Sequence, residues 1–258
     1  MRNIIKALHY QTRTDNVTYY SILLMLFFAA MTFIDSNITK TTGSEYIAHS
    51  GESLSLMPTF ALLMLSIRIC GWDYSDKTMN YEIMSGHHRK EVYFGRVIVS
   101  LAWCVTLCFV FMVLPTLIFT LVNGWGVTMD LGGMAIRYLL VLLPMIRIVC
   151  QCIMLTFLVK SAYVAWAAGF VITMVVSMFT MIAEVLTEIK LTWHTATTNL
   201  MKLFTFNQKM GYVNGEDVTI CETALDPSFV IGTIAVSLTV SVICIVLGYL
   251  FFKKSDVN

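Results

Sequence analysis

The chain has 258 residues, of which 57% are hydrophobic and only 13% are charged, and its mean hydropathy is +0.75. A soluble domain usually has about 25% charged residues, so this composition excludes an ordinary soluble protein and indicates a polytopic membrane protein. The formal net charge of +1 gives no electrostatic reason to expect nucleic acid as a partner.

Apolar runs and amphipathic spacing divide the chain into elements that are predicted in order. Residues 1–16 mix apolar and basic side chains at helical spacing, which predicts a short helix lying in the membrane interface. Six runs are each close to the length of about 20 residues that a helix needs to cross the hydrocarbon core. The predicted spans are residues 17–34, 54–71, 97–122, 134–159, 162–183 and 229–252. The predicted fold class is therefore an all-α polytopic membrane protein that forms a single transmembrane domain.

The basic residues are distributed unevenly among the polar segments. They are concentrated in the N-terminal tail, in residues 72–96, at Lys160 and in the C-terminal tail. The positive-inside rule then predicts that both termini and the 72–96 loop are cytoplasmic. The longest polar region, residues 184–227, is predicted to be extracellular, either as a lid over the outer helix ends or as a gate that contacts a substrate.

The 72–96 loop contains a second predicted helix. Ser75 or Asp76 can cap its start, and Gly86 can end it. Apolar residues recur three and four positions apart, which gives this helix one apolar side. Two interpretations remain open, namely an ordinary solvated loop between two spans and a docking helix for a soluble partner.

Motifs for chemistry are missing from the sequence. There is no P-loop sequence and no H-E-x-x-H motif, so the chain is expected to have no catalytic residues and no metal site of its own. No acidic residue lies deep in a predicted span, which argues against an ion-coupled carrier. His87 and His88 are interpreted as solvated residues rather than metal ligands.

Two features inside the predicted spans remain. Arg147 lies near the middle of the fourth span and shares a face with Gln151. This pair predicts either a hydrogen-bonded clamp between helices or the lining of a polar substrate path. Ala162, Ala165 and Gly169 form a stripe of small side chains that allows close helix packing, either within the chain or at a subunit interface.

The predicted topology has six spans, an N-terminal interfacial helix and a polar segment after the second span. That segment contains a pattern of acidic, polar and basic residues, namely Asp73, Lys77, Thr78, Tyr81, Glu82, Ile83, Ser85, Gly86, Arg89, Gly95 and Arg96. The topology and this pattern together resemble the type-2 ATP-binding-cassette (ABC) exporter permeases, and most closely those of Firmicutes linked to lantibiotic or bacitracin immunity and to drug export. At one position the pattern departs from the family, because Lys77 stands where the family usually has glycine.

The resemblance implies that this segment holds the coupling helix that docks on a separate ATPase. The implied coupling residues are Asp76, Lys77, Thr78, Met79, Tyr81, Glu82, Ile83, Met84 and Arg89. It also implies a dimeric ATPase that binds ATP and Mg, a second identical or homologous permease, membrane lipid around the spans, and a location in the bacterial plasma membrane. The expected cargo is amphipathic: an antimicrobial peptide such as a lantibiotic, a drug or a lipid-like molecule.

Two other functions stay open. One is a membrane sensor or assembly factor that binds a partner through the same loop without transport, and the other is an ion-coupled secondary transporter.

Overall fold

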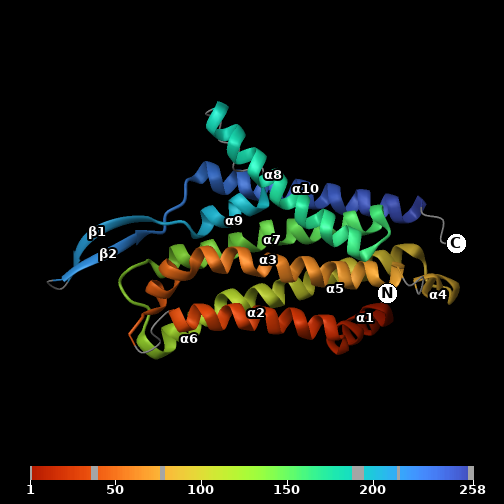
Figure 1. The fold of residues 1–258 in the computed structure, drawn as a ribbon, viewed down its shortest axis with the longest axis horizontal. Coiled ribbons are helices and arrows are strands. Elements are labelled where there is room, and N and C mark those ends of the chain that lie inside the picture. Colours follow the sequence, from red (N-terminus) through yellow and green to blue (C-terminus); the bar gives the residue numbers. More distant parts are fainter. Residues whose placement is uncertain (1, 36–39, 76–78, 188–194, 214–215, 255–258) are drawn as a thin grey trace.

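The computed structural model of the chain describes residues 2–35, 40–75, 79–187, 195–213 and 216–254. They form a bundle of helices with a β-hairpin projecting from one end (Figure 1). The elements in chain order are α1 Arg2–Thr14, α2 Asn16–Asp35, α3 Gly43–Ser75, α4 Met79–Met84, α5 Arg89–Cys108, the π-helical turn η1 Phe109–Val113, α6 Leu114–Asn123, α7 Leu131–Val159, α8 Ala162–Thr187, α9 Ala196–Phe204, β1 Asn207–Val213, β2 Glu216–Glu222 and α10 Pro227–Lys254.

The bundle confirms a largely helical membrane protein. Among the described residues, four helices are long and apolar enough to cross a membrane, namely the continuous helix 89–123 formed by α5, η1 and α6, together with α7, α8 and α10. The apolar parts of α2 and α3 are shorter, at Asn16–Thr32 and Ala61–Trp72. Six spans and the orientation of the termini therefore remain predictions.

The helix predicted at the N-terminus is present as α1. Its apolar side packs against α5, and Ile4, Leu8 and Thr12 are buried there. Gly95 of α5 allows this close approach, because a Cβ atom at that position would lie 3.1 Å from Ile4 Cγ2. Tertiary packing thus holds α1 to the bundle, while its place in the membrane interface stays a prediction.

Two helices begin well before their predicted spans. Helix α3 begins at Gly43 rather than near residue 54, because Tyr46 and Ile47 are fully buried and Tyr46 stacks on Phe119 with ring centroids 4.3 Å apart. Helix α5 begins at Arg89 rather than at residue 97, so the end of the predicted 72–96 loop is helical. In both cases residues that were predicted to lie in a polar loop are part of the helix, because the added turns are buried against neighbouring elements.

The predicted 184–227 loop has structure of its own. Helix α9 is buried along most of its length and packs on α3 and α7. Strands β1 and β2 pair antiparallel from Asn207 opposite Glu222 to Val213 opposite Glu216. The hairpin was not predicted, and both roles expected for this region, a lid and a substrate gate, stay predictions.

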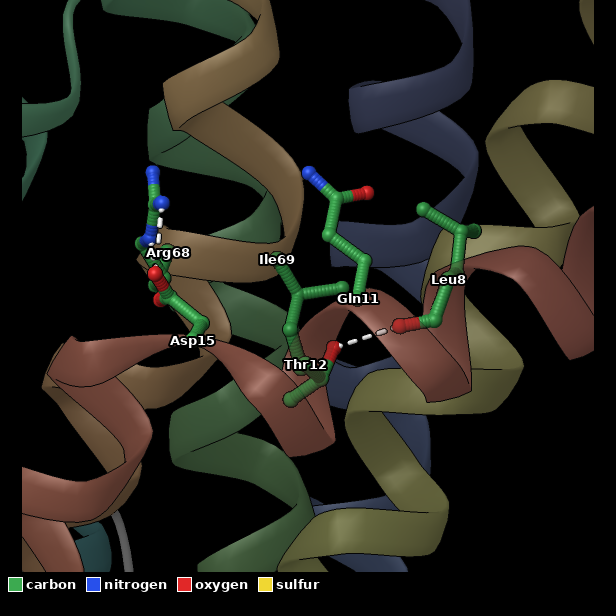
Figure 2. Close-up of a pocket in the computed structure, with 6 residues that line it drawn as sticks. All are labelled: Leu8, Gln11, Thr12, Asp15, Arg68 and Ile69. Carbon is green, nitrogen blue, oxygen red and sulfur yellow. Dashed lines mark hydrogen bonds and ion pairs between the residues drawn. The ribbon is translucent and has the colours of Figure 1, made fainter.

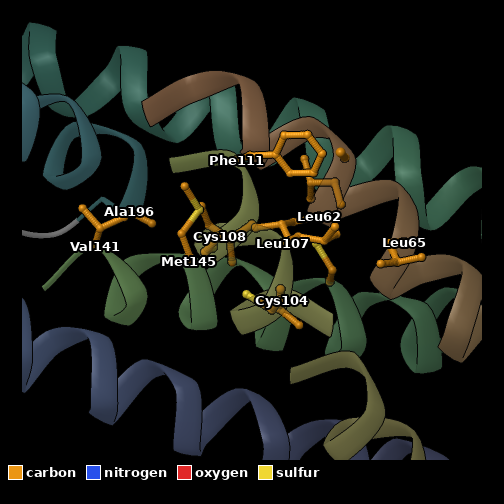
Figure 3. Close-up of a cluster of buried hydrophobic side chains, with 14 of the residues drawn as sticks. Leu62, Leu65, Cys104, Leu107, Cys108, Phe111, Val141, Met145 and Ala196 are labelled. Atoms are coloured by element: carbon orange, nitrogen blue, oxygen red, sulfur yellow. The ribbon is translucent and has the colours of Figure 1, made fainter. Parts of the chain in front are cut away.

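Helix α7 lies at the centre of the bundle and packs on α3, α5, α8, α9 and α10. Figure 3 shows apolar side chains from α3, α5, η1, α7 and α9 meeting in one cluster. Cys104 and Cys108 belong to this cluster and are not disulfide-bonded, so they act as small apolar side chains.

Candidate functional site

The predicted coupling residues that the structure describes lie at the end of the bundle that carries α4. The N-terminus, α4 and the C-terminal end of α10 are found there, opposite the hairpin (Figure 1). The α7–α8 turn at Lys160 is at the same end, since Phe157 and Phe252 are in contact with ring centroids 5.1 Å apart. The four segments that carry most of the basic residues therefore meet at one end, which we call the α4 end.

The short helix predicted in the 72–96 loop is confirmed. Met79, Tyr81, Glu82, Ile83 and Met84 lie in α4, whereas Asp76, Lys77 and Thr78 lie outside the described residues.

Helix α4 ends where the sequence predicts. Gly86 has a φ of +94°, a conformation that favours glycine, and its N–H donates to the carbonyl of Ile83 over 3.1 Å.

An arginine from α5 holds α4 on the bundle. Arg96 Nη2 donates to both carboxylate oxygens of Glu82, each over 3.0 Å, and Arg96 Nη1 donates to the carbonyl of Ile69 in α3 over 2.7 Å. The Arg96 side chain has no exposed surface, whereas that of Glu82 is 31% exposed. We call this arrangement the Arg96 clasp; it joins α3, α4 and α5 through one side chain.

The start of α5 is also joined to the end of α10. Arg89 Nη1 donates to the carbonyl of Lys253 over 3.0 Å, and the hydroxyl of Tyr93 donates to the carbonyl of Ile245 over 2.7 Å. Gly248 makes room for the Tyr93 ring, because a Cβ atom there would lie 2.6 Å from its hydroxyl oxygen. Displacement of α5 at this end would therefore be passed to α10.

One large apolar side chain of α4 is exposed. Met84 is 81% exposed although it is a large apolar residue, while Ile83 packs against the core. An exposed apolar side chain on a short helix that the bundle holds in place can be buried against another protein. Glu82, predicted as a coupling residue, is engaged by Arg96 within the chain.

A second ion pair lies close by at the junction of α1 and α2. Arg68 of α3 donates two hydrogen bonds to the carboxylate of Asp15, from Nε to Oδ2 over 2.5 Å and from Nη2 to Oδ1 over 2.9 Å (Figure 2). The guanidinium also stacks on Trp72, 4.2 Å from the ring centre. The partner of Arg68 could not be read from the sequence, because Asp15 is 53 residues away.

The residues predicted for a substrate path lie on the side of α7 that faces α10. Arg147 is buried, with Cys244 of α10 close to its charge, and Ser241 of α10 hydrogen-bonds the thiol of Cys150. Gln151 is half-buried. This position suits a contact between helices, and the substrate path stays a prediction.

The predicted stripe of small residues on α8 packs within the chain. Ala162, Ala165 and Gly169 are buried, and Ala162 lies against Gly71 of α3. A Cβ atom at Gly169 would lie 3.7 Å from both Leu63 and Cys152, so α8 meets α3 and α7 there.

At the hairpin end a buried arginine that the sequence did not single out joins α9 and the hairpin to α7. Arg137 of α7 donates to the carbonyls of Leu203 over 2.8 Å and of Thr223 over 2.9 Å, and it stacks on Phe206 with 4.6 Å to the ring centre. Weaker contacts reach three further carbonyls, those of Thr205, Glu222 and Ala224. We call this arrangement the Arg137 cradle. It joins α7 to the end of α9 and to the segments at which the hairpin begins and ends.

Among the described residues no group of histidine, cysteine and acidic side chains could hold a metal ion. A search of curated proteins found no match to this sequence. A family model described as "Protein of unknown function (DUF2705)" matches residues 21–258, which include α4 and the four described helices that are long and apolar enough to cross a membrane. The chain is therefore a member of the DUF2705 family.

Proposed function

We propose that this chain is the membrane-spanning permease subunit of an ABC exporter of the type-2 class, powered by a separate ATPase. The observation that carries the proposal is α4, a short helix joined to α3 and α5 by the Arg96 clasp, with its residue Met84 exposed. In this proposal α4 is the coupling helix. ATP and Mg would bind to the ATPase, and this chain would have no catalytic residue.

The contacts around α4 provide a physical route for coupling. A push on α4 would act through the Arg96 clasp on the end of α3 and the start of α5. From α5 it would continue to α10 through the Arg89 and Tyr93 hydrogen bonds. ATP binding can then favour one of two helix packings only if these contacts move together as a unit.

The predicted orientation agrees with this arrangement. The positive-inside rule assigns the cytoplasmic side to the basic segments, and these meet at the α4 end. The ATPase would therefore dock from the cytoplasm, and α9 with the hairpin would lie outside the bacterial plasma membrane. Two permease chains, identical or homologous, would enclose a path for an amphipathic cargo such as a lantibiotic, a drug or a lipid-like molecule.

The test is to co-purify the chain with a candidate ATPase and to measure cargo movement driven by ATP in reconstituted membranes. Met84→Asp should weaken ATPase capture by about tenfold, because it removes apolar contact area and places a charge in the interface. Met210→Asp is the matched control, since Met210 is also a highly exposed methionine, at 89%, but lies in the hairpin. Equal loss in both variants, or no bound ATPase with wild type, would contradict the proposal.

The same experiment separates the alternatives. A sensor or assembly factor would bind its partner through α4 without moving cargo. An ion-coupled carrier would move cargo without any ATPase.

A further inference from the structure

An apolar pocket opens on the side of the bundle between α2 and α8, with α3 as its floor. Its volume is about 330 Å³, which lies in the range of sites that bind small molecules. Its lining is almost entirely apolar and includes Val17 of α2, Met64, Ile67 and Trp72 of α3, and Tyr163 and Trp166 of α8. We call it the α2–α8 pocket.

The packing of the helices leaves this pocket open sideways. Helix α3 packs on both α2 and α8, but no extensive contact joins α2 to α8 among the described residues. Tyr163 is 69% exposed and Trp166 is 42% exposed at the pocket edge. In a membrane-embedded bundle such an opening faces lipid rather than water, so hydrocarbon can enter it from the bilayer.

Polar and amphipathic groups mark one edge of the pocket. Arg68 lies there, bound to Asp15 and stacked on Trp72, and Trp72 meets Tyr163 edge to face with ring centroids 5.3 Å apart. Tryptophan and tyrosine favour the level at which lipid headgroups meet acyl chains. The amphipathic helix α1 ends next to this edge, at Thr14. The pocket therefore runs from headgroup level into the hydrocarbon layer.

We propose that the α2–α8 pocket binds one acyl chain of a phospholipid from the surrounding bilayer, with the headgroup beside the Arg68–Asp15 pair. The proposal needs only the membrane location of the chain and does not rest on coupling to an ATPase. The bound chain would fill the gap between α2 and α8. Because Asp15 neutralises Arg68, binding should depend on the acyl chain rather than on an anionic headgroup.

The first experiment measures retained phospholipid by native mass spectrometry after purification with palmitoyl-oleoyl phosphatidylcholine. Wild type should retain one molecule for each chain. Val17→Trp and Met64→Trp fill the pocket and should each lower retention by about tenfold. Val171→Trp is the control, because Val171 is an exposed residue of α8 that does not line the pocket.

The second experiment guards against variants that misfold. A phosphatidylcholine with a photoreactive acyl chain is cross-linked to wild type and to each variant that elutes as a single species. The cross-links should map to α3 and α8 around Met64 and Trp166 in wild type, and they should be lost there in Val17→Trp. No retained phospholipid in wild type, or equal retention in all variants, would overturn the proposal. So would a change of oligomeric state in Val17→Trp without loss of lipid, since the pocket would then be covered by a second copy of this chain.

Discussion

Two fully or nearly buried arginines hold opposite ends of this molecule, and they do so with different partners. Arg96 at the α4 end binds the carboxylate of Glu82 and the carbonyl of Ile69, whereas Arg137 at the hairpin end binds carbonyls and, among the described residues, no carboxylate. The clasp depends on a side chain that is 31% exposed and so is partly screened by solvent. The cradle depends on backbone carbonyls of two segments. A backbone carbonyl, unlike a carboxylate at the end of a side chain, cannot turn away by rotation about side-chain bonds.

This difference indicates that the two ends of the bundle resist displacement to different extents. At the α4 end the Arg96 clasp includes a carboxylate on a flexible, partly exposed side chain, which can follow α4 when α4 is displaced. The Arg137 cradle can be released only if the end of α9 and the segments at which the hairpin begins and ends move together. We therefore expect the α4 end to be the adaptable end and the hairpin end to be the rigid one.

The largest effect is expected from Arg137→Ala. It removes two short charge-assisted hydrogen bonds and the stacking on Phe206, and it leaves buried carbonyls without a donor, which should cost about 3–5 kcal/mol in unfolding free energy. Thermal unfolding in detergent measures this loss. Arg137→Lys should recover part of it, because one ammonium can reach some of the carbonyls. Wild-type stability of Arg137→Ala would disprove the role given to the cradle.

A smaller effect is expected from breaking the Arg96 clasp. Glu82→Ala leaves the buried guanidinium without its carboxylate, but partial exposure of Glu82 limits the loss to about 2 kcal/mol. Arg96→Met should cost more because it also removes the bond to Ile69. A double-mutant cycle measured by thermal unfolding should give a coupling of about 1–2 kcal/mol between the two residues. Additive losses would show that the pair does not act as one contact.

The next effect concerns Cys221, which is buried in β2 beside the cradle, while the other six cysteines lie in the helices of the bundle. Burial raises the pKa of the Cys221 thiol, so less of the reactive thiolate is present at neutral pH. Labelling by a membrane-impermeant maleimide should therefore be slow at pH 7 and rise about tenfold for each pH unit up to the pKa. In Arg137→Ala the released hairpin should expose the thiol and restore its ordinary pKa.

The same labelling tests the orientation. Intact cells should be labelled at Cys221 if the hairpin end lies outside, as the distribution of basic residues predicts. Labelling only after the membrane is made permeable would place the α4 end outside and would contradict the proposed docking of a cytoplasmic ATPase.

The smallest effect is expected from Lys209→Ala. Lys209 pairs with Glu222 over 3.1 Å across the hairpin, but the two side chains are 70% and 43% exposed. An exposed ion pair of this kind contributes about 0–1 kcal/mol, and salt screens it. Thermal unfolding should therefore hardly change, which makes this variant the control for Arg137→Ala. A loss comparable with that of Arg137→Ala would mean that the pairing of β1 with β2, rather than the Arg137 cradle, keeps α9 and the hairpin in place.

Sequence and structure agree best where the signal is local. The helix after Ser75 and its end at Gly86 follow from spacing and from the conformational preference of glycine, and both are present in the described residues. Glu82 and Arg96 are only 14 residues apart and both were singled out, although their contact was not predicted. The α1 helix was predicted because its apolar side repeats at helical spacing.

Agreement is poorest where partners are distant in the chain. The cradle joins Arg137 to carbonyls 66 to 87 residues away, and every residue has a carbonyl, so no pattern of side chains indicates which ones accept. The early start of α3 likewise depends on the stacking of Tyr46 on Phe119, a contact across 73 positions that spacing within either segment cannot reveal.

The sequence by itself determined that this is a helical membrane protein with an amphipathic N-terminal helix and a short helix after α3, because apolar run length and periodicity are properties of each segment alone. Only the tertiary structure decided which arginine holds which end, how the hairpin is seated and where α2 and α8 leave a pocket. These depend on the relative positions of helices, and those positions follow from packing between residues that are far apart in the chain.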